Sequence, residues 1–488
     1  MNALQAPHFL TVDWWALGPI LALTTGACLL LLLEFLPTGA RGNRGAIVAL
    51  LTLVAAGVAV FTVRDDRRSL FDGMFVHDGV TVFFTLLFSA IGVMSVLLSW
   101  DYLKRMRINQ GEYYALMLLS TIGMITMSAS NDLITVFLGL ELMSLPLYVL
   151  VGFRRDHLES NEASLKYFLL GAFASGFLLY GIALLYGATG TTNLTRMAEF
   201  LTGTLVVGNP MFVVGAVLLL VGFAFKVSVV PFHMWTPDAY EGAPTAVTAF
   251  MSAGAKAAGF AAVVRVGLNV LGAQQAQWAP LLAALAILTM TVGNVTALLQ
   301  SNLKRMLAYS SIAHAGYVLV ALVAGGSNGA SAALFYLAVY TFMNLGAFGI
   351  LTLLGRDHDE RVLISDVAGL GTRHPLLAFS MALFMLSLGG IPPTAGFMGK
   401  VYVFRVALEA GQLPLVVIGV LNSVVSVFYY LRVTVAMYME EPLGEPTPLM
   451  RTWPGAVALA AAVFFTLWWG VQASTLLEQA QHSVLGLL

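Results

Sequence analysis

Five ionisable residues stand inside long apolar stretches of this sequence. They are one glutamate, three lysines and one histidine: Glu141, Lys226, Lys256, His314 and Lys400. An ionisable side chain at the centre of a bilayer costs roughly 2.5–3.5 kcal/mol, so such residues normally face a polar interior and mark an ion or proton path. Carboxylate, amine and imidazole groups all exchange protons. We therefore predict that these five residues form a proton relay inside a membrane protein.

The composition agrees with a membrane environment. Of the 488 residues, 59% are hydrophobic and only 10% are charged, whereas a soluble domain carries about 25% charged residues. The net charge is −1 and no block of like charges appears, so we expect a lipid bilayer and no nucleic acid as the surroundings. The single cysteine, Cys28, cannot supply an iron–sulfur cluster, a disulfide framework or a redox pair. Any electron chemistry must therefore happen elsewhere.

Apolar stretches long enough to cross a bilayer recur along the whole sequence. A spanning helix needs about 20 mostly apolar residues, and this length predicts an all-α membrane protein with about 14 transmembrane helices. We expect them near 14–36, 45–63, 79–101, 112–129, 131–152, 163–187, 211–236, 244–271, 279–300, 304–324, 328–354, 375–408, 412–438 and 453–474. The first lacks the flanks of a cleaved signal peptide, so we expect it to be retained.

Prolines interrupt the seventh and the twelfth predicted helices. Pro231 follows Lys226 by five residues, and the pair Pro392-Pro393 shortly precedes Lys400. Because the breaks are five helices apart, we predict two inverted five-helix repeats, helices 4–8 and 9–13, a recurring transporter design. Alternatively, the prolines only kink two helices for packing. The predicted division is 1–110 for three leading helices, 111–275 for the first repeat, 276–440 for the second, and 441–488 for the last helix.

Lysine and arginine are distributed unevenly between the predicted loops. With the first residue outside, the inner side receives thirteen of them and the outer side four. This bias follows the positive-inside rule and places both termini on the outer side. The inner set is Arg41, Arg44, Lys104, Arg105, Arg107, Arg154, Arg155, Lys304, Arg305, Arg356, Arg361, Arg373 and Arg451. The outer set is Arg64, Arg67, Arg68 and Arg196.

Glu141 and Lys226 fall at comparable depths of the fifth and seventh predicted helices. Glu141 lies ten residues past the polar residue Asn131, which is near mid-membrane at about 1.5 Å per residue. Burying one charge alone is far costlier than burying a pair, so Lys226 is the natural partner of this carboxylate. The alternative is a static ion pair that only holds two helices together.

The other three candidates lie further along the chain. Lys256 stands in the run SAGAKAAG, whose small residues leave room for water and offer no partner from the same helix. A lysine of this kind can bind and release a proton. His314 lies in the tenth helix, the repeat counterpart of the helix that bears Glu141, so we favour a relay role over that of a hydrogen-bonded core histidine. Lys400 ends the series, and we expect it to release protons outward.

Other charged residues receive simpler interpretations. His233, Asp238 and Glu241 cluster just after Pro231, where we expect capping or loop ordering, with a role in proton access as the alternative. Their spacing does not fit a metal site. Four charges near helix ends are expected to snorkel or to anchor the helices: Lys166, Arg265, Arg405 and Arg432.

Four segments together resemble the antiporter-like membrane subunits of complex I, the proton-pumping NADH-quinone oxidoreductase. They read GLELMSLP at 139–146, FKVSVVPFHMWTPDAYEGAP at 225–244, NLKRMLAYSSIAHAGY at 302–317 and GGIPPTAGFMGK at 389–400. The resemblance covers nearly all of residues 110–440 and is closest to the branch called subunit N. Two features favour that branch: the run DAYEGAP at 238–244 and a lysine, not a glutamate, at position 400.

The resemblance implies roles, cofactors and partners. Glu141 and Lys226 would be the coupling pair, Lys256 the central proton carrier, His314 the bridging histidine and Lys400 the terminal lysine on the exit side. The chain itself would hold no cofactor, since NADH, FMN, iron–sulfur clusters and quinone would bind to other subunits. Expected partners are the antiporter-like subunit M and the small subunit K, in a bacterial inner membrane.

Two other function classes stay open on the sequence alone. The first is a subunit of a multisubunit sodium/proton antiporter, which shares the lysines, the glutamate and the broken helices. Tyr240 argues against it, since that family typically has a histidine there, and sodium dependence of transport would discriminate. The second is a passive scaffold, in which the buried lysines could be replaced by methionine or leucine without functional loss.

Overall fold

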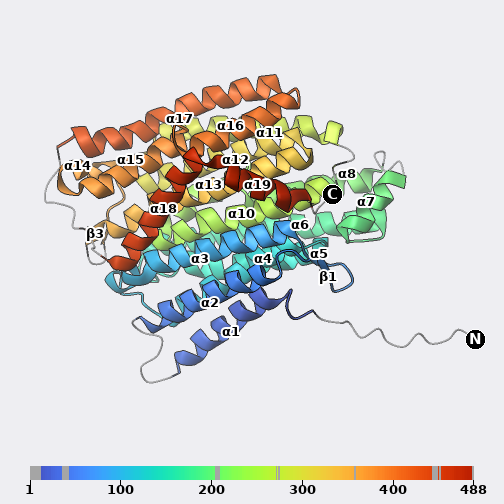
Figure 1. Cartoon of the computed structure of the whole chain (residues 1–488), viewed down its shortest axis with the longest axis horizontal. Coiled ribbons are helices and arrows are strands. Elements are labelled where there is room, and N and C mark those ends of the chain that lie inside the picture. The colour runs from blue at the N-terminus through green and yellow to red at the C-terminus, as the bar shows by residue number, and fades with distance from the viewer. Residues whose placement is uncertain are drawn as a thin grey trace, which may run out of the picture.

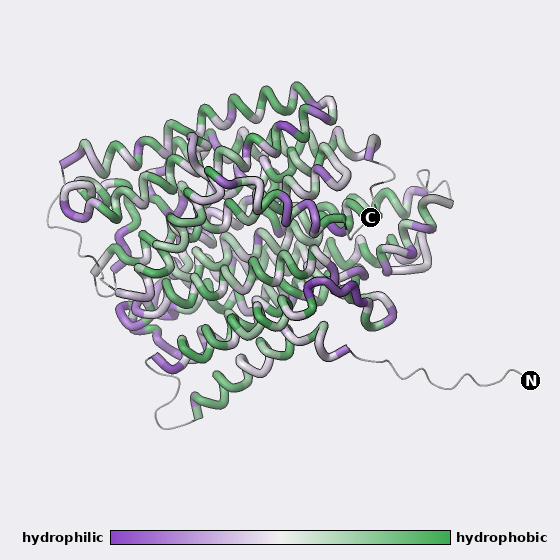
Figure 2. Tube along the Cα trace, in the orientation of Figure 1, coloured by the Kyte–Doolittle hydropathy of each residue, from purple (hydrophilic) through white to green (hydrophobic). Residues whose placement is uncertain are grey.

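The computed structural model describes residues 13–35, 43–203, 209–270, 272, 275–356, 359–441, 449 and 452–485. Arg41 and Arg451 of the predicted inner set lie outside the described residues. Long helices lie side by side and fill the molecule, with their axes along the horizontal direction of Figure 1. Their apolar residues occupy the middle of this bundle, and hydrophilic residues gather at its ends (Figure 2). This is the arrangement expected of helices that cross a bilayer.

The elements follow one another in a simple order. Before the first break come α1 (Gly18–Leu33), α2 (Arg44–Thr62), the hairpin strands β1 (Arg68–Leu70) and β2 (Phe75–His77), α3 (Gly79–Arg105), α4 (Gly111–Ala129), α5 (Leu133–Val151), α6 (Leu158–Thr189), α7 (Leu194–Gly203) and α8 (Pro210–Lys226). Between the two breaks come α9 (Trp235–Gly242), α10 (Thr245–Asn269), α11 (Gln275–Leu298), α12 (Leu303–Ala324), α13 (Gly326–Leu353), β3 (Gly355–Arg356), β4 (Asp359–Glu360), the 3-10 turn η3 (Ile364–Val367), α14 (Leu370–Arg373) and α15 (Pro375–Gly389). After the second break come α16 (Ala395–Glu409), α17 (Leu413–Met439), α18 (Trp453–Val471) and α19 (Ala473–Leu485).

Ten of the described helices are long and apolar enough to cross a membrane, and α1, α8 and α15 are shorter apolar helices. The two breaks predicted at the prolines are confirmed. Helix α8 ends at Lys226 and α9 begins at Trp235, so Pro231 lies between them. Likewise, α15 ends at Gly389 and α16 begins at Ala395. The chain is therefore an integral multi-pass helical protein with two interrupted helices.

Three helices form the interior of the bundle. The most apolar windows of α10 and α12 are each 94% buried, and that of α13 is fully buried. A helix that is apolar on all sides must be covered on all sides, and these three lie in the middle of Figure 1. Polar side chains on them are consequently shielded from lipid, which is the setting that a proton relay needs.

Four of the described helices were not predicted from the sequence. They are the short helices α7, α9, α14 and α19. Helix α19 buries one side through Ala473, Leu476, Ala480 and Val484, which recur at helical spacing, and it packs on α3 and α13. A search for apolar stretches of membrane length passes over such one-sided helices.

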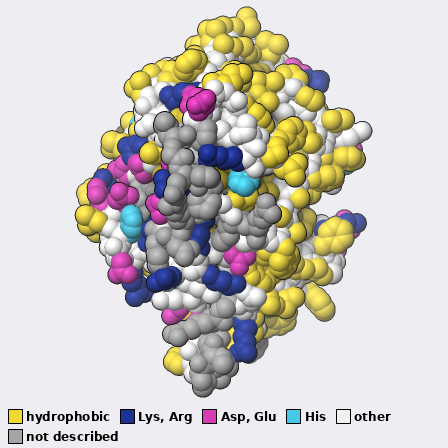
Figure 3. Space-filling view, turned by 90° about the vertical axis from the view of Figure 1, so that its left-hand side faces the viewer, with side chains coloured by type: hydrophobic (Ala, Val, Ile, Leu, Met, Phe, Trp, Pro, Cys, Tyr) yellow, Lys and Arg dark blue, Asp and Glu magenta, His cyan; other side chains and the backbone are white. Residues whose placement is uncertain are grey.

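Charged side chains gather at one end of the bundle. Figure 3 looks onto the end that lies at the left of Figure 1 and shows lysines, arginines and carboxylates together there, beside apolar side chains that belong to the flanks. Strands β3 and β4 lie at this end, whereas α1 begins and α19 ends toward the opposite end (Figure 1). The connection that carries β3 and β4 thus lies at the end of the molecule opposite to the start of α1 and the end of α19.

Candidate functional site

Glu141 lies on α5, and Lys226 is the last residue of α8. The Lys226 ammonium donates hydrogen bonds to the hydroxyl oxygens of Ser144 (2.8 Å) and Tyr167 (3.2 Å). Ser144 follows Glu141 by one helical turn, so the lysine reaches the helix that bears the carboxylate. The Glu141 carboxylate accepts a hydrogen bond from Ser175 on α6. Each member of the predicted pair thus has a serine hydroxyl as a partner, Ser175 for Glu141 and Ser144 for Lys226, and no direct ion pair between the two is present in the described part of the chain.

A small cavity lies between these groups. Its volume is about 10 Å³, and Ser144, Ser175 and Lys226 contribute polar atoms to its lining. This volume corresponds to roughly one water molecule. A water placed there would find two hydroxyls and one ammonium as partners. Ser175, the hydrogen-bond partner of Glu141, and Ser144, the partner of Lys226, thus line one cavity.

Lys256 lies on α10 and is only 3% exposed. Its ammonium donates hydrogen bonds to the carbonyl oxygen of Ser311 on α12 (2.5 Å) and to the Ser311 hydroxyl. The nitrogen also lies 5.9 Å from the centre of the Tyr340 ring. No carboxylate pairs with Lys256 in the described part of the chain. A hydroxyl partner can accept from an ammonium or donate to a neutral amine, so this setting accommodates both forms of the lysine.

His314 lies on α12 and is 2% exposed. Its Nδ1 is 2.7 Å from the hydroxyl of Tyr336 on α13, and its Nε2 is 3.2 Å from the hydroxyl of Tyr430 on α17. The Tyr340 ring, which faces Lys256, packs with its centre 5.1 Å from that of the imidazole. The histidine is therefore hydrogen-bonded on both nitrogens and shares an aromatic neighbour with Lys256.

Lys400 lies on α16 and is 4% exposed. Its ammonium donates to the carbonyl oxygens of the last two residues of α15 (3.1 and 2.8 Å) and to the Ser423 hydroxyl (2.8 Å). The lysine thus sits at the negative end of the α15 dipole, inside the second break. Gly390 in this break has φ +84°, and a Cβ there would lie 2.8 Å from the Lys400 side chain. Glycine is therefore required for the lysine to fit.

The charged cluster after Pro231 is built from ion pairs. Arg305 pairs with Asp238 (2.9 Å) and with Glu241 (2.6 Å), and Lys166 pairs with Asp238 (2.9 Å). Burial alone would raise the pKa of Asp238, but the hydrogen bonds from Lys166 and Arg305 hold it below its ordinary value. His233 is half-buried and takes no part in these pairs among the described residues. The cluster ties the ends of α6, α9 and α12 together, as the loop-ordering interpretation expects.

Arg265 corrects one expectation. It does not snorkel, because its side chain is only 1% exposed and donates to both oxygens of Asp78 (2.9 and 2.6 Å). Asp78 precedes α3 and comes next to Arg265 only through packing of α3 on α10. Arg405 pairs with Glu409 (2.8 Å) on the surface, and Arg432 donates to a backbone carbonyl of α11 (3.0 Å). Arg432 thus ties α17 to the end of α11, whereas the pair of Arg405 stays within α16.

Sequence reasoning missed the hydroxyl partners of the five candidates. The partners that matter most are Ser144, Ser311, Tyr336 and Tyr430, and the Tyr340 ring packs beside Lys256 and His314. A signal did exist, because Tyr336 and Tyr340 are four residues apart on a helix without charges and so share one face. What the sequence does not show is which residue of another helix this face meets.

Comparison with known proteins places the chain among relatives. Residues 130–426 match the family described as NADH:quinone oxidoreductase/Mrp antiporter, TM. NADH-quinone oxidoreductase subunit N of Trichlorobacter lovleyi is 49% identical over 99% of both chains. The protein of the same name from Chloroflexus aggregans is 45% identical over 94% of this chain and 95% of its own.

Solved structures show the same fold. A chain of respiratory complex I from Thermus thermophilus with bound aureothin superimposes with a TM-score of 0.80 at 36% identity, over 94% of this chain and 98% of that chain. A chain of the Mrp complex from Dietzia superimposes with a TM-score of 0.83 over 97% of both chains, but at 23% identity it supports the fold alone.

The fold and the buried lysines at two broken helices define an antiporter-like membrane subunit. Within that class, the chain belongs to the family of NADH-quinone oxidoreductase subunit N.

Proposed function

We propose that this chain is a proton-translocating membrane subunit of a bacterial NADH-quinone oxidoreductase and that it acts without a redox centre of its own. Its relatives bear the name of that complex over nearly their whole length. Among the described residues, Lys226, Lys256, His314 and Lys400 are buried and Glu141 is partly buried, which supports the proposed relay. NADH, FMN, iron–sulfur clusters and quinone belong, in this proposal, to other subunits.

The setting of Lys256 carries the proposal. A buried ammonium that served only structure would be expected to have an anionic partner, because an unpaired buried charge is costly. Lys256 instead has the hydroxyl and the carbonyl of Ser311. These neutral partners accept the charged lysine without fixing it in that form, which suits a group that carries protons.

The proposed sequence of events starts at Glu141. Quinone reduction elsewhere in the complex displaces the Glu141 carboxylate relative to Lys226, and the lysine passes its proton toward Lys256. The proton then moves to His314 and to Lys400, which releases it on the outer side. The energy scale is adequate, since one pKa unit is about 1.4 kcal/mol and moving a charge against 100 mV costs about 2.3 kcal/mol.

The topology belongs to the same proposal. Counting α8 with α9, and α15 with α16, as single interrupted spans gives fourteen crossings, arranged as two inverted repeats over 111–275 and 276–440. The bacterial inner membrane then holds the chain with both termini on the periplasmic side. Subunits M and K are the proposed neighbours within the membrane arm.

The test is NADH-driven, quinone-linked proton pumping in membranes that carry Lys256→Ala. We expect an assembled complex with pumping reduced by roughly tenfold or more, because a carrier in series is lost. Unaltered pumping in an assembled complex would contradict the proposal and favour a scaffold. Sodium dependence of the transport, measured in the same membranes, would favour the sodium/proton antiporter.

A further inference from the structure

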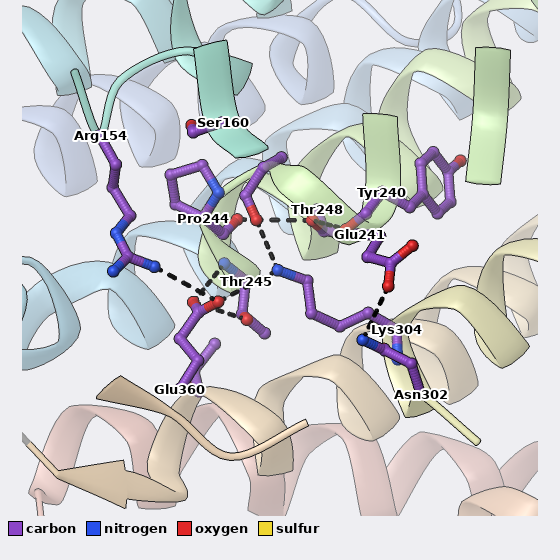
Figure 4. A network of polar contacts seen from close by, with 12 residues as sticks. Arg154, Ser160, Tyr240, Glu241, Pro244, Thr245, Thr248, Asn302, Lys304 and Glu360 are labelled. Atoms are coloured by element: carbon purple, nitrogen blue, oxygen red, sulfur yellow. Dashed lines mark hydrogen bonds and ion pairs between the residues drawn. The ribbon is translucent and has the colours of Figure 1, made fainter. Parts of the chain in front are cut away.

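Glu360 is a buried carboxylate that neither the sequence analysis nor the proposed relay uses. It lies on β4, in the connection between α13 and α15, and its side chain is 11% exposed. Figure 4 shows it at the centre of a polar network with Thr245, Lys304 and Arg154. The Tyr102 hydroxyl, at the end of α3, also donates to this carboxylate. One loop residue therefore contacts four other parts of the chain.

The carboxylate caps α10 from a distance. The residue before this helix is Pro244, whose side chain makes no capping hydrogen bond. The backbone nitrogen of Thr245 and its hydroxyl donate instead to Glu360, at 2.9 and 2.8 Å. A carboxylate at this place satisfies a free N–H group and also interacts favourably with the positive end of the helix dipole. The start of α10 is thus fixed by a residue 115 positions away.

The same carboxylate binds the start of α12. Lys304, the second residue of α12, is 1% exposed and pairs with Glu360 at 3.1 Å. Its ammonium also donates to the carbonyl oxygen of Ala243, just before α10 (2.6 Å). Arg154, between α5 and α6, lies 3.7 Å from the second Glu360 oxygen. Burial alone would raise the pKa of Glu360, but the Lys304 charge and the hydrogen bonds from Tyr102 and Thr245 hold it at about 2.

The contacts of Glu360 with Thr245 and Lys304 form a clamp between α10 and α12. This clamp and the proposed relay lie on the same two helices. Lys256 is eleven residues after Thr245 on α10, and Ser311 is seven residues after Lys304 on α12. Because an α-helix rises by about 1.5 Å per residue and is stiff along its axis, the clamp fixes how far each residue lies from the inner end. A shift of α10 by one residue's rise would break the 2.5 Å hydrogen bond between Lys256 and Ser311.

A second contact also fixes the position of α10 along its axis. Asn344 on α13 donates to the Ser252 hydroxyl on α10 at 2.5 Å. Ser252 lies one turn before Lys256, and α13 leads directly into the strands that carry Glu360. The segment from α13 to β4 thus holds α10 at two points. One is Ser252, one turn before Lys256, and the other is Thr245 at the start of the helix.

We infer that Glu360 is a positioning residue for Lys256: with Lys304 it sets the axial register of α10 against α12, on which the contact between Lys256 and Ser311 depends. The inference rests on the proposed function, since it assigns a role toward the relay. It also assigns the loop after α13 to the machinery, although this loop contains none of the five relay candidates.

The test is a double-mutant cycle on proton pumping per NADH oxidised. The variants are Glu360→Gln, Ser311→Ala and the two together, with Glu409→Gln as the matched control because Glu409 pairs with Arg405 on the exposed surface of α16. We expect each single change at 360 and 311 to lower pumping by roughly threefold in an assembled complex. Because both changes act through one contact, the double variant should pump as well as the single variant that pumps less. The control Glu409→Gln should pump normally.

Several results would overturn the inference. Multiplicative losses in the double variant would mean that Glu360 acts independently of Ser311, and normal pumping in Glu360→Gln would remove its role. If Glu360→Gln does not assemble, the pair Lys304→Met with Glu360→Gln takes its place, because it removes both charges together. Normal pumping in Lys256→Ala would refute the relay itself, whereas a loss there with multiplicative losses in the cycle would refute only the positioning role.

Discussion

Buried charges in this protein are of two kinds at the residue scale. Glu360 and Asp78 are surrounded by cations and by N–H or O–H donors that fix them as carboxylates. Lys256 and Lys400 are held by carbonyl and hydroxyl oxygens. The first kind of setting favours one charge state, and the second accommodates two. The distinction separates groups that hold the structure from groups suited to carrying protons.

A pH dependence of stability follows for Glu360. Its pKa falls from the ordinary 4.5 to about 2 in the folded protein, which corresponds to roughly 3 kcal/mol of stabilisation. Because the folded pKa is the lower one, this stabilisation is complete above pH 4.5 and is lost as the pH falls toward 2. We expect the melting temperature of the detergent-solubilised protein to exceed that of Glu360→Gln by a constant margin between pH 8 and 5. The margin should shrink below pH 4.5, and an unchanged margin at pH 3 would contradict the assignment.

The sequence points to the relay candidates but not to Glu360. A lysine within an apolar stretch is conspicuous, so Lys226, Lys256 and Lys400 are candidates from the sequence alone, and their burial agrees with it. Glu360 stands in a short polar connection beside Asp359 and Arg361, where a carboxylate normally faces solvent. Its burial arises from contacts with helices more than fifty residues away in the chain, which no local pattern encodes.

Small residues set how closely the helices approach at the element scale. A Cβ at Gly293 of α11 would lie 2.7 Å from the backbone nitrogen of Ala313 on α12, the residue before His314. A Cβ at Gly259 of α10 would lie 2.7 Å from the Val227 side chain, beside Lys226. The backbone contact at Gly293 requires glycine, because neither helix can yield without moving its neighbours.

Replacing Gly293 by alanine should therefore destabilise the protein and disturb His314. The new methyl group would meet the backbone of α12, which cannot rotate away, and overpacking of this kind costs about 1–3 kcal/mol. The matched control is Gly176→Ala on α6, where a Cβ would meet nothing within 4 Å. There we expect unchanged or slightly higher stability, since alanine favours a helix by about 1 kcal/mol over glycine. The measurements are the melting temperature and the proton pumping of both variants. If Gly293→Ala matched Gly176→Ala in both, α11 would be able to move aside.

Helix breaks were predictable at this scale, and helices that lie on the surface were not. The prolines at 231, 392 and 393 coincide with both interruptions, whereas Pro146 lies inside α5 without ending it. The one-sided helix α19 carries no membrane-length apolar run, and its buried side becomes meaningful only against α3 and α13. The inverted repeats and the number of spans stay predictions.

The whole molecule is organised around α10, which is fixed at both ends. Glu360 holds its first residue, and Arg265 near its other end forms a fully buried pair with Asp78 at the start of α3. Asp78 also accepts from the Thr81 nitrogen and so caps α3. The helix that bears Lys256 is thereby tied to the leading helices at one end and to the second half of the chain at the other.

Breaking the ion pair of Asp78 and Arg265 should lower the stability of the whole bundle. Asp78→Asn keeps an acceptor for the cap of α3 but leaves the Arg265 charge buried and unpaired, which costs about 3–5 kcal/mol. We expect the amount of assembled complex and its melting temperature to fall. Adding Arg265→Met should restore much of the loss, since no buried charge remains. Glu409→Gln, which breaks an exposed pair, should cost at most about 1 kcal/mol. If the double variant were no more stable than Asp78→Asn, the pair would stabilise the bundle through its hydrogen bonds to α3. The balance of charge would then make no contribution at this end of α10.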